Sequence, residues 1–156
     1  MDAADQDFLS EGERAFLLAL NRLGVRYLLV GMSAALLQGA RGATEVVDIW
    51  FESTDDPRIG EAARQAGGFW ITRTQPSMLG GAVGERFDVV IVLSGLPDFA
   101  AEYTGAISET VAGVEVKVLP LARILHSKLA AARVKDEPGI HQIRLAISVL
   151  DELKRK

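Results

Sequence analysis

The sequence of 156 residues has no cysteine and only two histidines. Without cysteine, disulfide frameworks, thiolate zinc sites and cysteine nucleophiles are excluded. His126 and His141 lie far apart and lack the spacing of a zinc site, so we expect both at the surface. No serine lies in a Gly-x-Ser-x-Gly motif, and Gly80, Gly81 and Gly84 do not lead into a helix with Lys-Ser/Thr. A hydrolase nucleophile and a Walker-type phosphate loop are therefore not indicated.

A long hydrophobic run is also missing. The longest apolar stretch, residues 27–37, is interrupted by Gly31 and Ser33 and is shorter than the roughly 20 residues that span a bilayer. The first eight residues carry three aspartates and no basic residue, whereas a secretory signal begins with a basic region. We therefore expect a cytoplasmic protein without a membrane segment.

Basic residues are too few for a protein that coats nucleic acid, because the net charge is −4. The charge is unevenly distributed: residues 1–119 sum to −8 and residues 120–156 to +4. An anionic ligand held between an acidic body and a basic C-terminal segment would explain this division. Two solvated helix surfaces are the simpler explanation.

Length and composition predict a single domain over residues 1–156, with a flexible N-terminus at about residues 1–9. Apolar periodicity and turn residues predict alternating helices and strands, and we expect an α+β fold with a mixed sheet flanked by helices. The expected helices cover 10–23, 33–38, 57–66, 98–103, 120–134 and a last segment from 138. The expected strands cover 27–30, 46–51, 69–72, 87–93, 107–111 and 114–119, and residues 75–84 are expected to form a mobile loop.

Asp48 and Asp88 are lone carboxylates inside apolar strands. A buried carboxylate needs a cation, a metal or a hydrogen-bond donor, because an unpaired buried charge is costly. Two such residues on neighbouring strands could converge on one divalent ion, and Mg²⁺ prefers oxygen ligands of this kind. Ion pairs with Arg86 or Arg41 are the alternative.

Gly31 follows the strand 27–30 and precedes a short helix. A strand, a glycine and a helix bring backbone N–H groups to the edge of a sheet, which is an arrangement that binds phosphate. A phosphate cradle followed by Asp48 and then by Asp88 is an order that suits metal-assisted phosphoryl transfer.

This order resembles the polymerase-beta-like nucleotidyltransferase superfamily, above all its small bacterial members, some of which act in toxin–antitoxin and resistance systems. Residues 24–34 read GVRYLLVGMSA and resemble the family's Gly-Val-x-Tyr-x-Leu-Val-Gly-Gly-x-Ala. Residues 43–50 read ATEVVDIW and resemble Arg-x-Thr-x-Asp-Ile-Asp-Leu-Trp. The later family carboxylate matches Asp88 in RFDVV, and residues 127–136, SKLAAARVKD, resemble Ser-Lys-x-Ala-Ala-Gly-Arg-x-Lys-Asp.

The resemblance implies a nucleotidyltransferase-like fold with C-terminal helices. It implies Asp48 and Asp88 as catalytic residues and Mg²⁺ ligands, with a nucleoside triphosphate or another phosphate ligand as partner. The nucleotide-binding residues that it implies are Gly31, Met32, Ser33, Lys128 and Lys135. Lys128 and Lys135 share a face if their helix continues through both, and they could then neutralise a triphosphate or an RNA end. Surface lysines whose stems cover apolar positions are the alternative.

The chain also departs from the family pattern. Val46 stands at the first aspartate of the Asp-x-Asp pair, on the face that a continuous strand would share with Asp48. Met32 replaces the second glycine of the cradle, where its side chain would obstruct a phosphate. Arg41 lies three residues before Thr44 rather than two, and Gly139 stands where many relatives have an aspartate. Each change weakens metal or nucleotide binding.

Three functions follow as hypotheses. The first is a nucleotidyltransferase-like protein with weakened or lost catalysis that binds a nucleotide or phosphate ligand beside Gly31, Asp48 and Asp88. The second is an active Mg²⁺-dependent transferase that moves a nucleotidyl group from a nucleoside triphosphate to a hydroxyl group. The third is an antitoxin-like or regulatory subunit whose basic C-terminal helices contact a protein or RNA partner.

Overall fold

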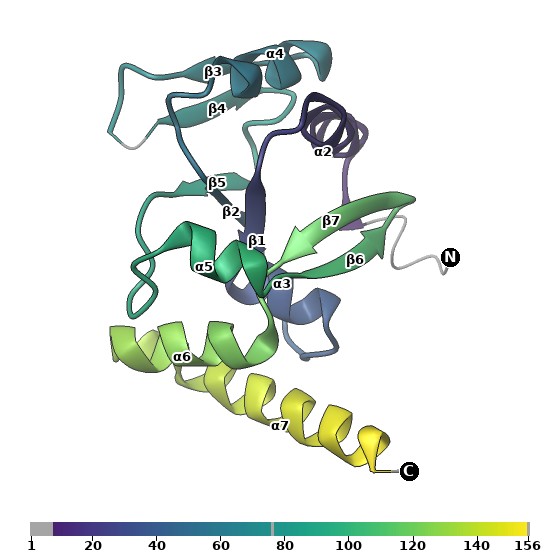
Figure 1. Ribbon diagram of the computed structural model, residues 1–156, viewed down its shortest axis with the longest axis vertical. Coiled ribbons are helices and arrows are strands. Elements are labelled where there is room, and N and C mark those ends of the chain that lie inside the picture. Colours follow the sequence, from purple (N-terminus) through teal and green to yellow (C-terminus); the bar gives the residue numbers. More distant parts are fainter. Residues whose placement is uncertain (1–7, 76, 156) are drawn as a thin grey trace.

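The computed structural model describes residues 8–75 and 77–155. Five strands form a mixed sheet in the spatial order β5-β2-β1-β7-β6, and this sheet lies at the centre of the molecule (Figure 1). Its strands are β1 (Tyr27–Val30), β2 (Val47–Phe51), β5 (Phe87–Val90), β6 (Ile107–Val111) and β7 (Val114–Val118). The expected α+β class with a mixed sheet is confirmed.

The strand directions decide which side chains meet. β1 runs antiparallel to β2, β2 runs parallel to β5, and β7 runs parallel to β1 and antiparallel to β6. In this register Asp48 is paired with Val30 on one side and with Asp88 on the other. Directly paired residues project from the same face of a sheet, so these three side chains share one face.

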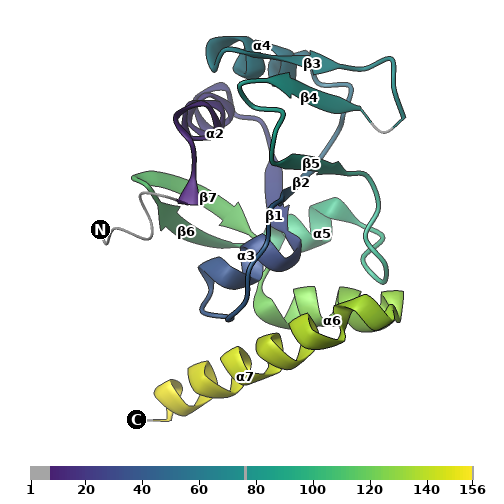
Figure 2. The ribbon, with the colours of Figure 1, turned by 180° about the vertical axis from the view of Figure 1, so that it is seen from behind.

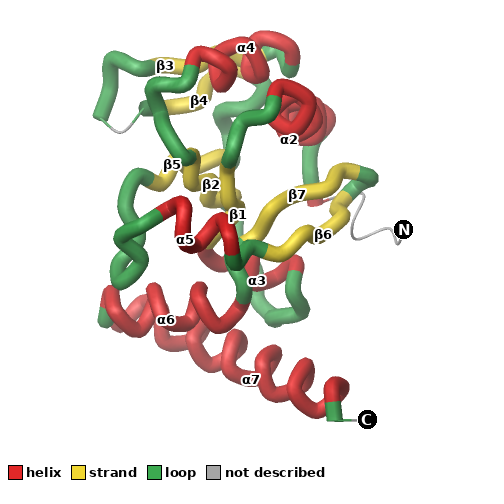
Figure 3. The backbone as a smooth tube through the Cα atoms, in the orientation of Figure 1, coloured by secondary structure: helices red, strands yellow, loops and turns green. Residues whose placement is uncertain are grey.

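Most of the helices lie in two groups at opposite ends of the molecule, and α5 (Phe99–Thr104) lies beside the central sheet between them (Figure 2). At one end α2 packs on α4, and at the other end α6 packs on α7 and α3; the tube in Figure 3 shows the same two groups in red. Their bounds are α2 (Glu11–Leu23), α3 (Gly31–Leu37), α4 (Pro57–Gln65), α5 (Phe99–Thr104), α6 (Leu121–Ala131), the 3₁₀ helix η1 (Val134–Asp136) and α7 (Glu137–Lys154).

The helix starts follow the sequence closely. Ser10 and Glu13 form the expected capping box at α2, and Gly24 ends that helix in the left-handed region. Asp56 caps α4 before Pro57, as expected for proline at the first helical position. These ends are specified locally because each cap uses residues within four positions of the helix end.

The segment 75–84 contains a strand, and the expectation of a mobile loop there is wrong. β4 (Met78–Gly81) pairs antiparallel with β3 (Gly68–Ile71) in a separate two-stranded sheet. A Cβ atom at Gly80 would lie 2.3 Å from the Phe69 ring. The glycine therefore lets the aromatic ring of β3 lie against the backbone of β4. Glycine is also typical of loops, so the sequence alone does not distinguish this packing role from a loop.

The N-terminus expected to be flexible, at about residues 1–9, is described only from Phe8 on. Residues 1–7 lie outside the described residues, but Leu9 is buried and Phe8 offers its carbonyl oxygen to Arg86. The core that Leu9 joins extends over the central sheet and α2.

The predicted helix from Pro120 ends earlier than expected. α6 stops at Ala131 because Ala132 takes the left-handed conformation (φ 53°), and η1 follows. Lys128 and Lys135 therefore do not lie on one continuous helix, so the shared face expected for them does not form.

Candidate functional site

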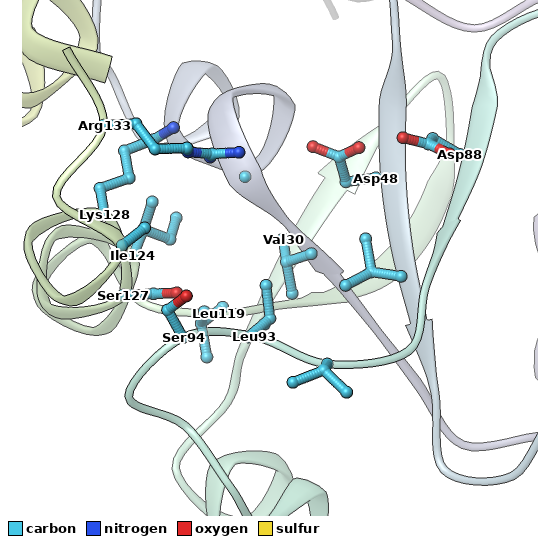
Figure 4. Close-up of a pocket in the computed structure, with 14 residues that line it drawn as sticks. Val30, Asp48, Asp88, Leu93, Ser94, Leu119, Ile124, Ser127, Lys128 and Arg133 are labelled. Atoms are coloured by element: carbon cyan, nitrogen blue, oxygen red, sulfur yellow. The ribbon is translucent and has the colours of Figure 1, made fainter. Parts of the chain in front are cut away.

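A cavity of about 370 Å³ opens between one face of the central sheet and α6 (Figure 4). Asp48 from β2 and Asp88 from β5 lie at one end of the cavity, and Lys128 and Arg133 lie on the opposite wall. The cavity thus collects two carboxylates and two cations from segments that are far apart in sequence.

Gly31 is the residue that makes room for Asp48. It has a φ of +68°, and a Cβ atom there would lie only 2.2 Å from Asp48 Oδ2. Any side chain at position 31 would therefore collide with the carboxylate, in a backbone conformation that only glycine adopts readily. This is a specific reason for glycine between β1 and α3.

The electrostatics of Asp48 are unusual for a carboxylate. Burial, followed by the negative charge of Asp88, raises the pKa of Asp48 to about 6, and the positive charges of Lys128 and Arg133 oppose this rise. Asp88 is exposed, so Asp48 bears most of the cost of desolvation. Lys128 and Arg133 offset only part of the cost of ionising Asp48, so the site favours a further cation.

The arginine pairing considered as an alternative is not what forms. Arg86 donates from Nε to Glu13 Oε2 at 2.9 Å and from Nη2 to the carbonyl oxygen of Phe8 at 2.5 Å. Arg41 is exposed and lines other surface pockets. The two aspartates are therefore not neutralised by either arginine.

Asp136 positions the two cations of the cavity, Lys128 and Arg133, through hydrogen bonds. Its carboxylate accepts from Lys128 Nζ at 3.2 Å and from Arg133 Nε at 2.7 Å. Burial raises the pKa of Asp136, but the hydrogen bonds from Arg133 and Lys128 outweigh this effect and leave the pKa below its usual value. The Lys128 side chain is only 14 % exposed, so it is positioned beside the cavity rather than free in solvent. Figure 4 shows the Arg133 guanidinium extending toward Asp48.

The rest of the cavity is apolar with two hydroxyl groups. Leu93, Leu119 and Ile124 form the apolar wall, and Ser94 and Ser127 lie together between the loop after β5 and α6. The cavity has a charged end and an apolar end, and its volume lies within the range of small-molecule pockets. It can accommodate a ligand that joins an anionic group to an organic ring.

Three residues predicted to bind nucleotide do not line this cavity: Met32, Ser33 and Lys135. The Ser33 hydroxyl is buried and donates to the carbonyl oxygen of Val30 at 3.3 Å. The Met32 side chain was expected to obstruct a phosphate, but it lies near Gly42 and Gly139 and does not enter the cavity. Lys135 is exposed and borders a neighbouring pocket.

Val46 also lies outside the cavity. β2 begins at Val47, and Val46 is 42 % exposed at a different surface pocket beside Leu36 and Arg86. The face shared with Asp48 was expected from a strand that starts at residue 46. The strand starts one residue later, so period-two alternation does not apply there.

The described residues supply two carboxylates for a metal. Within residues 8–75 and 77–155, no group of three or more acidic, histidine or cysteine side chains could hold an ion. Two carboxylates on adjacent strands still fit one Mg²⁺, because this ion usually takes one or two protein carboxylates and completes its shell with water and substrate phosphates. The donor set therefore fits one ion that arrives with a phosphate ligand, and it lacks the ligands for two.

Sequence reasoning did not include Arg133 and Asp136 among the site residues. Both lie in the segment SKLAAARVKD, whose resemblance to the family motif had already indicated Lys128. The missing information was the left-handed break at Ala132, which turns Arg133 back toward Asp48 and brings Asp136 beneath Lys128.

The C-terminal helices present a mixed surface. Exposed apolar side chains on α7 include Leu145, Val149 and Leu153. No described helix is both long and apolar enough to span a bilayer.

Several solved structures resemble the chain. The crystal structure of ANT(2")-Ia in complex with adenylyl-2"-tobramycin has a TM-score of 0.57 at 14 % identity and covers 90 % of this chain and 88 % of that one. The solution structure of the antibiotic-resistance factor ANT(2'')-Ia has a TM-score of 0.61 at 14 % identity, with coverage of 96 % and 86 %. An antigenic nucleotidyltransferase-like protein from Paracoccidioides brasiliensis has a TM-score of 0.54 at 17 % identity, with coverage of 88 % and 75 %.

No protein-family model matches the sequence, and no curated protein is similar enough to count as a match. At 14–17 % identity the likeness to solved structures establishes the fold alone. The α+β architecture, the mixed sheet and the C-terminal helices agree with it throughout. The fold is therefore nucleotidyltransferase-like.

Proposed function

We propose that this protein binds a nucleoside triphosphate together with one Mg²⁺ in the cavity between the sheet and α6, and that it transfers the nucleotidyl group weakly or not at all. The observation that carries this proposal is the register pairing of Asp48 with Asp88, opposite Lys128 and Arg133. Such an arrangement places cation ligands and anion ligands on facing walls, as a metal–phosphate ligand requires.

The two walls of the cavity have different proposed roles, one in binding the metal and the other in binding phosphate. Asp48 and Asp88 are the ligands for Mg²⁺, which supplies charge neutralisation for phosphate oxygens when it is bound. Lys128 and Arg133 neutralise phosphate charge from the other wall, and Asp136 keeps both at fixed positions. The apolar wall formed by Leu93 and Ile124 packs against the base or the sugar.

Weak catalysis follows from the number of carboxylates. Transfer with two metal ions needs ligands for the ion that activates the acceptor hydroxyl as well as for the ion that holds the triphosphate. Val46, at the position of the further aspartate, is outside the cavity, and Glu45 is exposed. The chain is thus equipped to bind the nucleotide better than to activate an acceptor.

Calorimetry with ATP and CTP, each with and without Mg²⁺, tests this function. We expect binding that requires Mg²⁺ and that is lost in Asp48→Asn and in Asp88→Asn. Asp151→Asn is the matched control, because it removes one exposed carboxylate on α7 far along the chain from the cavity. The proposal is overturned if Mg²⁺ does not affect nucleotide binding, or if Asp48→Asn binds as well as the parent protein.

A transfer assay with labelled ATP and a range of hydroxyl acceptors tests the catalytic part separately. We expect turnover at or near background. Robust transfer that depends on Asp48 would replace the weakened-catalysis proposal with the active-transferase alternative, while leaving the binding site as assigned.

A further inference from the structure

The last two turns of α7 bury none of their side chains. Ile143 and Ala146 are the buried residues of this 18-residue helix, and every described residue from 148 to 155 is exposed. Figure 1 shows this end of α7 running on beyond α6. A short helical segment is marginal in water by itself, because most helical stability in proteins comes from the packing of an apolar face. A partner on this part of α7 would therefore stabilise it.

An apolar stripe runs along the exposed side of α7 into these two turns. It consists of Leu145, Val149 and Leu153, whose exposed fractions are 48 %, 58 % and 62 %. Residues four positions apart lie one above the other on a helix, so the three side chains form one continuous row. Single exposed apolar residues are common on protein surfaces, whereas a contiguous row is typical of a surface that packs against a partner.

The stripe is complementary to itself. Val149 lies at its centre, with one leucine four residues before it and one four residues after it. In an antiparallel pair of α7 helices with a two-fold axis at Val149, Leu145 of one copy lies opposite Leu153 of the other. A cavity of about 520 Å³ lies beside the stripe, between α7 and the turn at residues 38–41. This cavity leaves room for the incoming leucine.

The charges beside the stripe match under the same symmetry. Arg144 and Glu152 are exposed, and among the described residues neither forms an ion pair. The two residues lie on the same side of the helix, because they are eight positions apart. A two-fold axis at Val149 brings Glu152 of one copy to within two residues, or about 3 Å along the helix axis, of Arg144 of the other. An antiparallel pair thus forms two equivalent ion pairs, which a parallel pair would not form.

We propose that α7 is a dimerisation helix, through which two copies of this chain associate in an antiparallel contact with two-fold symmetry. A second copy is favoured over an unrelated partner because one register pairs the leucines and the opposite charges at the same time. No residue of α7 lines the cavity that contains Asp48 and Asp88. The proposed dimer therefore leaves the nucleotide site open in both copies and does not depend on the proposed function.

Sedimentation equilibrium of the full chain, from about 1 µM to about 1 mM, tests the association in the range expected for a small interface. We expect the mass to rise with concentration from 16.8 kDa toward twice that value. Val149→Glu places two carboxylates opposite each other at the axis and should weaken dimerisation at least about tenfold. Met78→Glu is the matched control, because Met78 is 49 % exposed on β4 and lies outside the proposed contact. A chain that stays monomeric throughout, or an equal loss in both variants, overturns the proposal.

Charge reversal tests the antiparallel register. Arg144→Glu alone and Glu152→Arg alone should each weaken dimerisation about fivefold, because each places like charges together at two symmetric points. The double variant Arg144→Glu/Glu152→Arg restores opposite charges across the contact and should dimerise within about twofold of the parent protein. If the double variant is as weak as either single variant, the two residues do not meet and the proposal is overturned.

The absence of cysteine permits a direct test of the symmetry axis. Val149→Cys introduces a single thiol at the axis, where two packed helices bring the two copies of one residue within reach of a disulfide. Oxidation should therefore cross-link Val149→Cys at least about tenfold faster than the control Met78→Cys, because association raises the effective concentration of the thiol. Equal rates of cross-linking in the two variants would place the contact elsewhere and overturn the proposal.

Discussion

Glu13 and Asp48 are both carboxylates that the fold removes from water, and they differ in what surrounds them. Glu13 is 3 % exposed, accepts from Arg86 and from the Ser10 N–H, and completes a helix cap. Burial raises its pKa, but the hydrogen bonds from Arg86 and Ser10 outweigh burial, so the pKa lies below the usual value. Glu13 is thus fully supplied with donors.

Asp48 has the opposite surroundings. Its nearest charged neighbour in the sheet is another carboxylate, Asp88, and its pKa is raised to about 6 by burial first and by Asp88 second. A protein gains nothing in stability from such a pair. The comparison teaches that a fully compensated carboxylate supports the fold, whereas one that is compensated only in part at a cavity indicates a ligand.

The largest effect is expected at Gly31. Gly31→Ala should destabilise the protein by about 3 kcal/mol, because the new methyl group meets Asp48 Oδ2 in a backbone conformation unfavourable to alanine. Urea denaturation measures the change. Combining it with Asp48→Ala should recover at least about 1 kcal/mol, because the second change removes the colliding oxygen. Additive effects would contradict a direct collision.

Glu13→Gln should destabilise by about 2 kcal/mol at pH 7, because it leaves Arg86 without its anion; the value is moderated by the partial exposure of Arg86. The lowered pKa of Glu13 means that its contribution is present above pH about 4.5 and is lost as pH falls through its folded pKa. Thermal melts from pH 3 to pH 7 should therefore converge for variant and parent at the acidic end. A constant difference across this range would contradict the ion pair as the cause.

Asp48→Asn should stabilise the protein, in contrast to Gly31→Ala and Glu13→Gln. The folded-state pKa of about 6 exceeds the unfolded value, so ionisation of Asp48 disfavours the folded state above that pH. In the absence of metal the variant should be more stable by about 2 kcal/mol at pH 8, and the difference should shrink through pH 6 and vanish below about pH 4. Thermal melts check this, and a destabilised variant at pH 8 would overturn the assignment.

The smallest effects are expected from the neighbours of Asp48. Asp88→Asn removes a repulsion and should lower the pKa of Asp48, whereas Lys128→Met removes an attraction and should raise it. NMR titration of the Asp48 carboxyl carbon measures both. The stability changes should stay below about 1 kcal/mol. Shifts of the same sign in both variants would contradict the arrangement of charges across the cavity.

Much of the candidate site could be predicted from local sequence. Asp48 and Asp88 are visible because a charge inside an apolar strand stands out, and Gly31 because it interrupts a buried run before a helix. Lys128 was indicated by the resemblance of its segment to a family motif. Residues such as Arg133 and Asp136 could not be assigned in this way, since their role depends on the direction of the chain after Ala132.

Errors came from patterns with two physical causes. Glycine-rich residues 75–84 resemble a loop, but Gly80 accommodates the Phe69 ring across a strand pair. Met32 was expected to obstruct the phosphate cradle, but it packs toward Gly139, a residue more than a hundred positions away. In both cases the sequence shows the small or the large residue, but the residue that packs against it is known only from the tertiary structure.

The sequence by itself determined the helix caps, most of the strands and the two isolated aspartates, because capping and burial act over a few neighbouring residues. Tertiary structure alone decided which charges meet. Asp48 comes beside Asp88 through the parallel register of β2 and β5, and Asp136 reaches Lys128 because the left-handed turn at Ala132 returns the chain toward α6. Electrostatic interactions depend on distance in space, and distances between segments far apart in sequence are fixed only when the sheet and the helices pack.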